Sequence, residues 1–163
     1  MTPGREDPAD AAKLAAHAAA LGDAIEAALP GWVDRSVRQV LADQGIDPDR
    51  RTRERIDEAA GAAVAEGGPR VRTLLETDID EQRTNPLAVL RSLVGHPTAV
   101  LREAGAQPVA RDDFKQRAFP DDVYDLSPAS FAEVDPLLHE PGLAWGAAKA
   151  YVHLSRRRRE GRR

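Results

Sequence analysis

The chain has 163 residues, the size of one domain, and contains no cysteine, which excludes a disulfide scaffold, a thiolate zinc site and a cysteine nucleophile. Its formal net charge of −4 combines +5 on residues 156–163 with −9 on the remainder. The acidic remainder does not look like a nucleic-acid-binding domain, because such a domain spreads positive charge over a folded face. Only 34 residues are Leu, Ile, Val or Phe and 29 are Ala, so we expect a thin, helical core.

Apolar residues at helical spacing predict two helices in the first part of the chain. The first carries a stripe of apolar residues over positions 14–29 and is expected to stop near Pro30. The second is marked by Trp32 and by the aliphatic residues that follow it up to Leu41. Gly45 and the turn after it are expected to end this second helix.

A third helix is predicted over residues 49–66, ended by Gly67 and Gly68, because glycine is common just past a helix C-terminus. Proline suits the first position of a helix, since its fixed φ matches that site and its missing N–H would be unpaired there. Three prolines are therefore each expected to open a new segment: Pro69, Pro86 and Pro97.

The last two of these prolines begin a short internal echo in which Ala, Val, Leu and Arg recur eleven residues apart. Two copies are too few for a solenoid, which needs about three repeats to bury a continuous core. The echo therefore predicts two short helices, over 86–94 and 97–103, that are closed by Gly95 and Gly105 as left-handed caps.

The helical pattern disappears over residues 106–126. This stretch contains two prolines, three aromatic residues and five aspartates. It predicts an irregular arm whose aromatic side chains attach it to the helices. Irregular connections of about 20 residues are uncommon in compact domains and tend to be functional or mobile.

Helix signals return after the arm. Ser127 followed by Pro128 predicts the start of a short helix that reaches about Val134. A further turn is expected at 137–138, and a closing helix from about Gly142. No segment alternates apolar and polar residues at period two, so the fold class is all-α, a bundle of about five to seven helices with an irregular arm and a C-terminal helix.

The predicted organisation has five parts along the chain, which are a flexible N-terminus over 1–8, a helical bundle over 9–105, the arm over 106–126, a C-terminal helical segment over 127–155 and a basic tail over 156–163. No apolar run approaches ~18 residues, and the N-terminus lacks the pattern of a signal peptide. We therefore expect a cytoplasmic protein without a transmembrane segment.

Catalytic and cofactor motifs are missing from the sequence. It has no Gly-rich phosphate loop, dinucleotide fingerprint, paired-histidine zinc helix, nucleophile elbow or calcium loop. We therefore expect no cofactor and no enzyme activity.

Arginines cluster at the start of the helix predicted over 49–66, where positive charge opposes the helix dipole. One interpretation is a contact with an anion or a phosphate backbone. The other is a solvent-exposed face on which Glu54 and Glu58 pair with neighbouring arginines.

The closing helix holds the most concentrated polar chemistry. Trp145, Lys149 and His153 are spaced four apart, so they share one stripe of a helix. Opposite the acidic arm, this stripe would form a polar groove for a carboxylate, a phosphate or a peptide. The alternative makes Trp145 a core residue and Lys149 a salt-bridge partner of the arm. The candidate partner-binding residues are Asp121, Asp122, Tyr124, Trp145, Lys149 and His153.

These patterns favour a non-catalytic helical interaction or regulatory module that binds an unknown protein partner through the arm and the closing helix. A second hypothesis is a nucleic-acid or ribosome-associated factor, whose binding would fall steeply with salt. A third is a metal-dependent or phosphate-handling enzyme built on Asp121, Asp122, Lys149 and His153. The nucleic-acid hypothesis depends on the tail residues Arg156, Arg157, Arg158, Arg159, Arg162 and Arg163.

Roughly the C-terminal half of the chain resembles a family of small uncharacterised actinobacterial proteins. The resemblance is carried by Pro97-Thr98, Val100-Leu101-Arg102, Ala104-Gly105, Pro108-Val109, Arg111-Asp112, Phe114, Phe119-Pro120-Asp121-Asp122, Tyr124, Leu126, Pro128-Ala129-Ser130, Pro141-Gly142-Leu143 and Trp145 to Lys149. It implies no activity, cofactor, partner or site residue for this chain.

Overall fold

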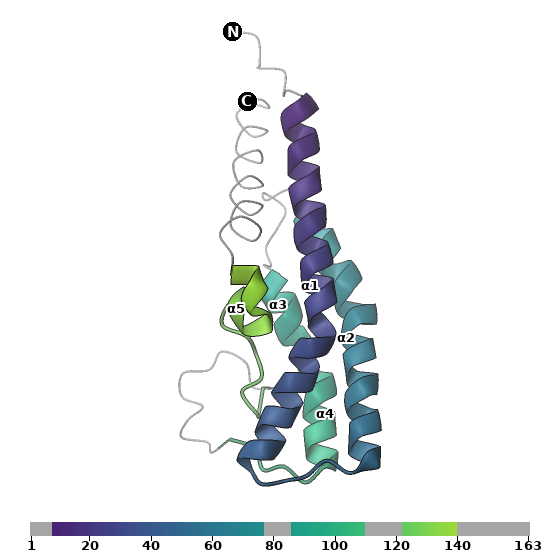
Figure 1. The fold of residues 1–163 in the computed structure, drawn as a ribbon, viewed down its shortest axis with the longest axis vertical. Helices are drawn as coiled ribbons and strands as arrows, with labels where there is room; N and C mark the ends of the chain where they lie inside the picture. Colours follow the sequence, from purple (N-terminus) through teal and green to yellow (C-terminus); the bar gives the residue numbers. More distant parts are fainter. Residues whose placement is uncertain (1–7, 77–85, 110–121, 140–163) are drawn as a thin grey trace.

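The structure is a computed structural model that describes residues 8–76, 86–109 and 122–139 (Figure 1). Over these residues the chain is helical and contains no strand, which confirms the all-α prediction for this part of the chain. The count of five to seven helices and the complete arm stay predictions. The elements in chain order are α1 (Pro8–Asp43), α2 (Arg50–Glu76), α3 (Pro86–Ser92), α4 (Gly95–Glu103), α5 (Phe131–Val134) and the 3-10 turn η2 (Pro136–His139).

Two long antiparallel helices, α1 and α2, lie side by side, and α3, α4 and α5 pack along them (Figure 1). The core is a narrow layer of aliphatic side chains between these helices, as the scarcity of large apolar residues predicts. Its largest fully buried side chains are Ile25, Leu29, Val33, Val37 and Leu41 of α1, Ile56 and Val71 of α2, Leu90 of α3, Leu93 between α3 and α4, Pro97 and Leu101 of α4, and Val134 of α5.

The prediction that Pro30 stops the first helix is wrong, because α1 continues through it to Asp43. Proline inside a helix costs about 3 kcal/mol, and burying one Val or Leu side chain gains about 1.5–3 kcal/mol. Leu29 and Val33 are fully buried on either side of the exposed Pro30, so the continuous apolar face outweighs the lost backbone bond. Figure 1 shows that α1 bends, and an internal proline is a common cause of such a bend.

The prediction that Gly67 and Gly68 end the third helix is also wrong, because α2 runs through both glycines and Pro69 to Glu76. These glycines are buried where α2 approaches its neighbours closely. A Cβ atom on Gly67 would lie 2.5 Å from Cδ1 of Leu93 and 3.3 Å from Cδ1 of Leu29. The glycine therefore provides space for packing between helices, and Pro69 opens no new segment.

The junction between α3 and α4 differs from the prediction at one glycine. Gly95 is the first residue of α4, and its φ is not positive, so it is no left-handed cap. α4 consequently begins two residues before Pro97. Gly105 has a φ of 82° just after α4, as predicted for a cap.

Exposed ion pairs connect the helices. Arg72 of α2 binds both Asp23, at 2.5 Å, and Glu26, at 2.9 Å, on α1. Arg55 of α2 donates to both carboxylate oxygens of Glu103 on α4, each at 3.0 Å. Because these groups are substantially exposed, the pairs add more to the alignment of the helices than to their stability.

The arginine cluster at the start of α2 forms the predicted salt-bridged face. Arg50 lies 3.0 Å from Glu54, and Arg55 lies 2.5 Å from Glu58. Asp49 accepts the backbone N–H of Thr52 at 2.7 Å, which caps the helix, and this bond lowers the pKa of the Asp49 carboxyl. These acids offset the unfavourable placement of arginines at a helix N-terminus.

The short helix after the arm starts later than predicted. Ser127 and Pro128 lie before the helix, and α5 begins at Phe131. The carboxylate of Glu133 accepts the backbone N–H of Ala129 at 2.6 Å, so one donor just before the helix is bound by a residue inside it. The turn expected at 137–138 is observed as η2. None of the described helices combines the length and apolar character needed to cross a bilayer.

Candidate functional site

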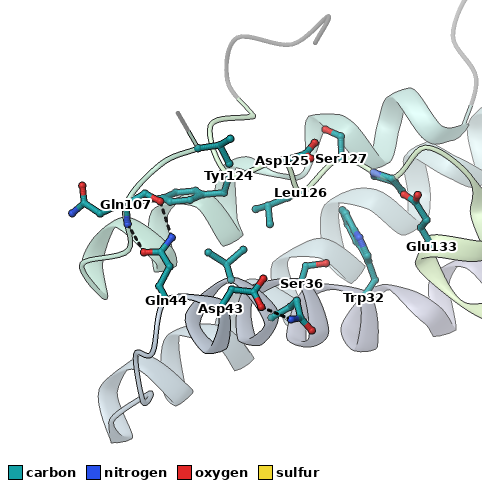
Figure 2. Close-up of a pocket in the computed structure, with 14 residues that line it drawn as sticks. Trp32, Ser36, Asp43, Gln44, Gln107, Tyr124, Asp125, Leu126, Ser127 and Glu133 are labelled. Atoms are coloured by element: carbon teal, nitrogen blue, oxygen red, sulfur yellow. Dashed lines mark hydrogen bonds between the residues drawn. The ribbon is translucent and has the colours of Figure 1, made fainter. Parts of the chain in front are cut away.

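A groove of about 520 Å³ lies between the second half of α1 and two non-helical segments, residues 106–109 and 122–128 (Figure 2). We call it the α1 groove. It extends from Gln44 and Gln107 at one end to Trp32 and Glu133 at the other.

One wall of the α1 groove is a single helix face. Trp32, Ser36 and Val40 follow each other at intervals of four, so they lie above one another on α1. Because each helical step adds 1.5 Å, the twelve steps from Trp32 to Gln44 span about 18 Å. The groove is therefore elongated along the helix axis.

Polar contacts join the opposite wall to the end of α1 and its two segments to each other. The side chain of Gln44 donates to the carbonyl of Gln107 at 2.8 Å and accepts its N–H at 2.7 Å. The buried Tyr124 hydroxyl donates to the carbonyl of Ala106 at 2.9 Å. The N–H of Val109 donates to the carbonyl of Val123 at 2.9 Å, so the two non-helical segments also bind each other.

Asp122 holds the turn from which this wall is built. Its side chain is 4% exposed, and its two carboxylate oxygens accept the N–H groups of Leu126, at 2.6 Å, and Ser127, at 3.0 Å. Its carbonyl accepts the N–H of Asp125 at 3.2 Å, and Asp125 has a φ of 56°. Both oxygens of Asp122 thus organise the backbone of the wall.

The interior of the α1 groove is apolar at its base and polar at its edges. Trp32, Tyr124 and Leu126 are buried and line the base. Burial raises the pKa of the Tyr124 hydroxyl, and the nearby Arg102 partly opposes this effect. The buried hydroxyl oxygen of Ser127 has no hydrogen-bond partner among the described residues.

Three carboxylates, from Asp43, Asp125 and Glu133, lie along the α1 groove, and no Lys, Arg or His side chain is among its described lining residues. Asp43 accepts the side-chain amide of Gln39 at 2.7 Å. The guanidinium of Arg35 lies close to one end, where it donates to the carbonyl of Val134. The groove therefore carries negative charge along an apolar base.

Two of the six predicted partner-binding residues lie in the described part of the chain, and the structure brings them together at one wall of the α1 groove. Tyr124 lines the groove with its ring, and Asp122 supports the wall without lining it. The other four, Asp121, Trp145, Lys149 and His153, lie outside the described residues, as do the tail arginines.

The residues on the α1 side of the groove are not among the predicted partner-binding residues. Ser36, Gln39 and Asp43 are polar residues next to the apolar stripe of α1, which is also the usual pattern of a solvent-exposed face. Among the described residues, no group of three His, Asp or Glu side chains is arranged to hold a metal ion.

Comparisons of the chain with protein families, curated proteins and solved structures find no match. The resemblance expected for the C-terminal half stays a prediction. The described residues define an all-helical protein with an acidic groove along its first helix.

Proposed function

We propose that the protein is a non-catalytic helical interaction module that binds a segment of a partner protein in the α1 groove. The observation that carries this proposal is the groove itself, with its apolar base and polar edges. Protein interfaces commonly combine a buried apolar centre that includes aromatic residues with a polar rim. Trp32 and Tyr124 supply the aromatic part of this pattern.

The length of the α1 groove supports an extended peptide segment as its occupant. About 18 Å corresponds to five or six residues of extended chain at ~3.3 Å per residue. Gln39 on α1 and Gln44 just after it provide side-chain amides beside such a segment. Trp145, Lys149 and His153 belong to the wider surface that we propose for the same partner.

A second candidate function, nucleic-acid binding, is favoured by the +5 charge on residues 156–163. This binding would depend on the tail and weaken steeply with salt, because each neutralised phosphate releases counterions. Replacing the six tail arginines by Gln in the full chain would remove it while leaving the α1 groove intact.

The proposed function predicts that filling the α1 groove abolishes peptide binding. A random library of peptides about nine residues long would be displayed on phage and selected on the full chain. Ser36→Trp introduces a large side chain into the groove, so the enriched peptides should bind this variant at least about tenfold more weakly. Fluorescence polarisation of the synthesised peptides measures the loss.

Ala42→Trp is the matched control, because it adds the same side chain at an exposed position of α1 outside the groove. It should leave peptide affinity unchanged, and circular dichroism should show both variants folded. Enriched peptides that bind Ser36→Trp as tightly as the wild type would contradict the proposed function.

A further inference from the structure

We infer that the α1 groove selects a positively charged, extended peptide segment with one apolar side chain. This inference rests on the proposed function and names the class of partner. It follows from two features of the groove, which are the sign of its charge and its apolar base.

The charge of the α1 groove determines the sign of the ligand. Asp43 lies on α1, Asp125 on the opposite wall and Glu133 at the end near Trp32, so a peptide in the groove passes between carboxylates on both sides. These carboxylates would repel an acidic peptide, and they would repel the phosphates of a nucleic acid in the same way. Lys and Arg side chains are complementary to these carboxylates, and Arg binds a carboxylate through two parallel hydrogen bonds.

The apolar base provides a place for one side chain without charge. The indole of Trp32 and the side chain of Leu126 face the groove from opposite walls (Figure 2). Half-buried Val40 lines the same region from α1. An aliphatic or aromatic side chain over these residues would bury apolar surface, while flanking cationic side chains reach the edges.

The test compares charge-neutralised variants of the full chain. Asp43→Asn keeps an acceptor for the amide of Gln39, and Asp125→Asn keeps a residue type that tolerates positive φ. Glu133 is left in place because it accepts the N–H of Ala129. The matched control is Asp47→Asn with Asp57→Asn, two exposed aspartates outside the groove.

The probes are the peptides enriched from the random library on the wild-type chain. We expect them to contain more Lys and Arg than the input library, and an apolar residue between the charges. The groove double variant should bind them about fivefold more weakly at low salt, and this difference should shrink as salt rises to about 0.5 M. The control double variant should bind like the wild type.

Two outcomes would overturn the inference while the proposed function stands. In the first, the enriched peptides lose affinity for Ser36→Trp but contain no excess of Lys and Arg. In the second, they bind the groove double variant as tightly as the wild type. Peptides that bind Ser36→Trp normally would overturn the proposed function itself. The tail arginines identify one other occupant, the chain's own C-terminus. If replacing them by Gln tightens peptide binding about tenfold or more, the tail occupies the groove and the partner assignment is wrong.

Discussion

At the scale of single residues, buried polar groups in this protein are used mainly to hold backbone in place. Asp122 is 4% exposed, and its carboxylate accepts two backbone N–H groups; Tyr124 is 3% exposed, and its hydroxyl donates to a backbone carbonyl. Thr98 and Ser127 are exceptions, because their buried hydroxyl oxygens have no hydrogen-bond partner among the described residues.

Thr98→Val should stabilise the protein. Valine has nearly the same shape as threonine, and the substitution removes a buried hydroxyl whose desolvation is not compensated. We expect the free energy of unfolding to rise by about 1 kcal/mol in urea denaturation. Thr73→Val is the control, because the exposed Thr73 hydroxyl donates to the carbonyl of Pro69 at 2.9 Å, and it should give no gain. A loss of stability in Thr98→Val would show that its hydroxyl is bonded in solution.

Tyr124→Phe should lower the free energy of unfolding by about 1 kcal/mol at neutral pH, because it leaves the carbonyl of Ala106 without its donor. Burial raises the pKa of Tyr124, so the neutral phenol favours the folded state. This contribution is complete below the unfolded pKa of about 10 and is lost as pH rises through the higher folded pKa. Denaturation at several alkaline pH values should therefore show a shrinking difference between the two proteins; a constant difference would contradict this.

At the scale of elements, tertiary packing decides where the helices end. α1 continues through Pro30 and α2 through Gly67, Gly68 and Pro69, although each residue is a local helix breaker. In both helices the packed face continues on either side of the breaker, with Leu29 and Val33 buried in α1 and Ala63 and Val71 buried in α2, so breaking the helix would expose apolar surface. The effect of a glycine in α2 on the free energy of unfolding therefore depends on what surrounds it.

The same substitution in α2 should have opposite effects at two glycines. Gly61→Ala meets no atom within 4 Å and replaces glycine by a better helix former, so it should stabilise by about 0.5–1 kcal/mol. Gly67→Ala places Cβ against Leu93 and should destabilise by about 1–3 kcal/mol despite the same gain in helix propensity. Thermal and urea denaturation of both variants measure the difference. If both substitutions changed the free energy of unfolding equally, Leu93 would be able to move away from α2 without cost, and the prediction would be wrong.

At the scale of the whole molecule, α1 connects the core to the candidate site. One of its faces packs on α2 and α4, and its second half forms a wall of the α1 groove. The opposite wall comes from residues far away in sequence, as the pairing of Gln44 with Gln107 illustrates. Variants that loosen the 122–127 turn should therefore alter the groove without touching α1.

The helical class could be predicted from the sequence because it depends on local spacing. Leu21, Ile25, Leu29, Val33 and Val37 keep the helical interval on both sides of Pro30, and they are all buried. The same continuity also argues against a stop at Pro30. Whether burial of the apolar face outweighs the cost of the proline, however, depends on what the face packs against. The candidate site was predicted only in part, at Tyr124 and at the neighbouring Asp122.

By itself, the sequence determined the elements whose cause lies within a few residues, such as the left-handed glycine after α4 and the ion pairs along the start of α2. Only the tertiary structure decided that Gly67 is a contact point, that Asp122 faces inward, and that Ser36 and Asp43 line a groove. The physical reason is that helical spacing identifies the face of a helix, whereas burial and charge complementarity depend on which distant segment covers that face.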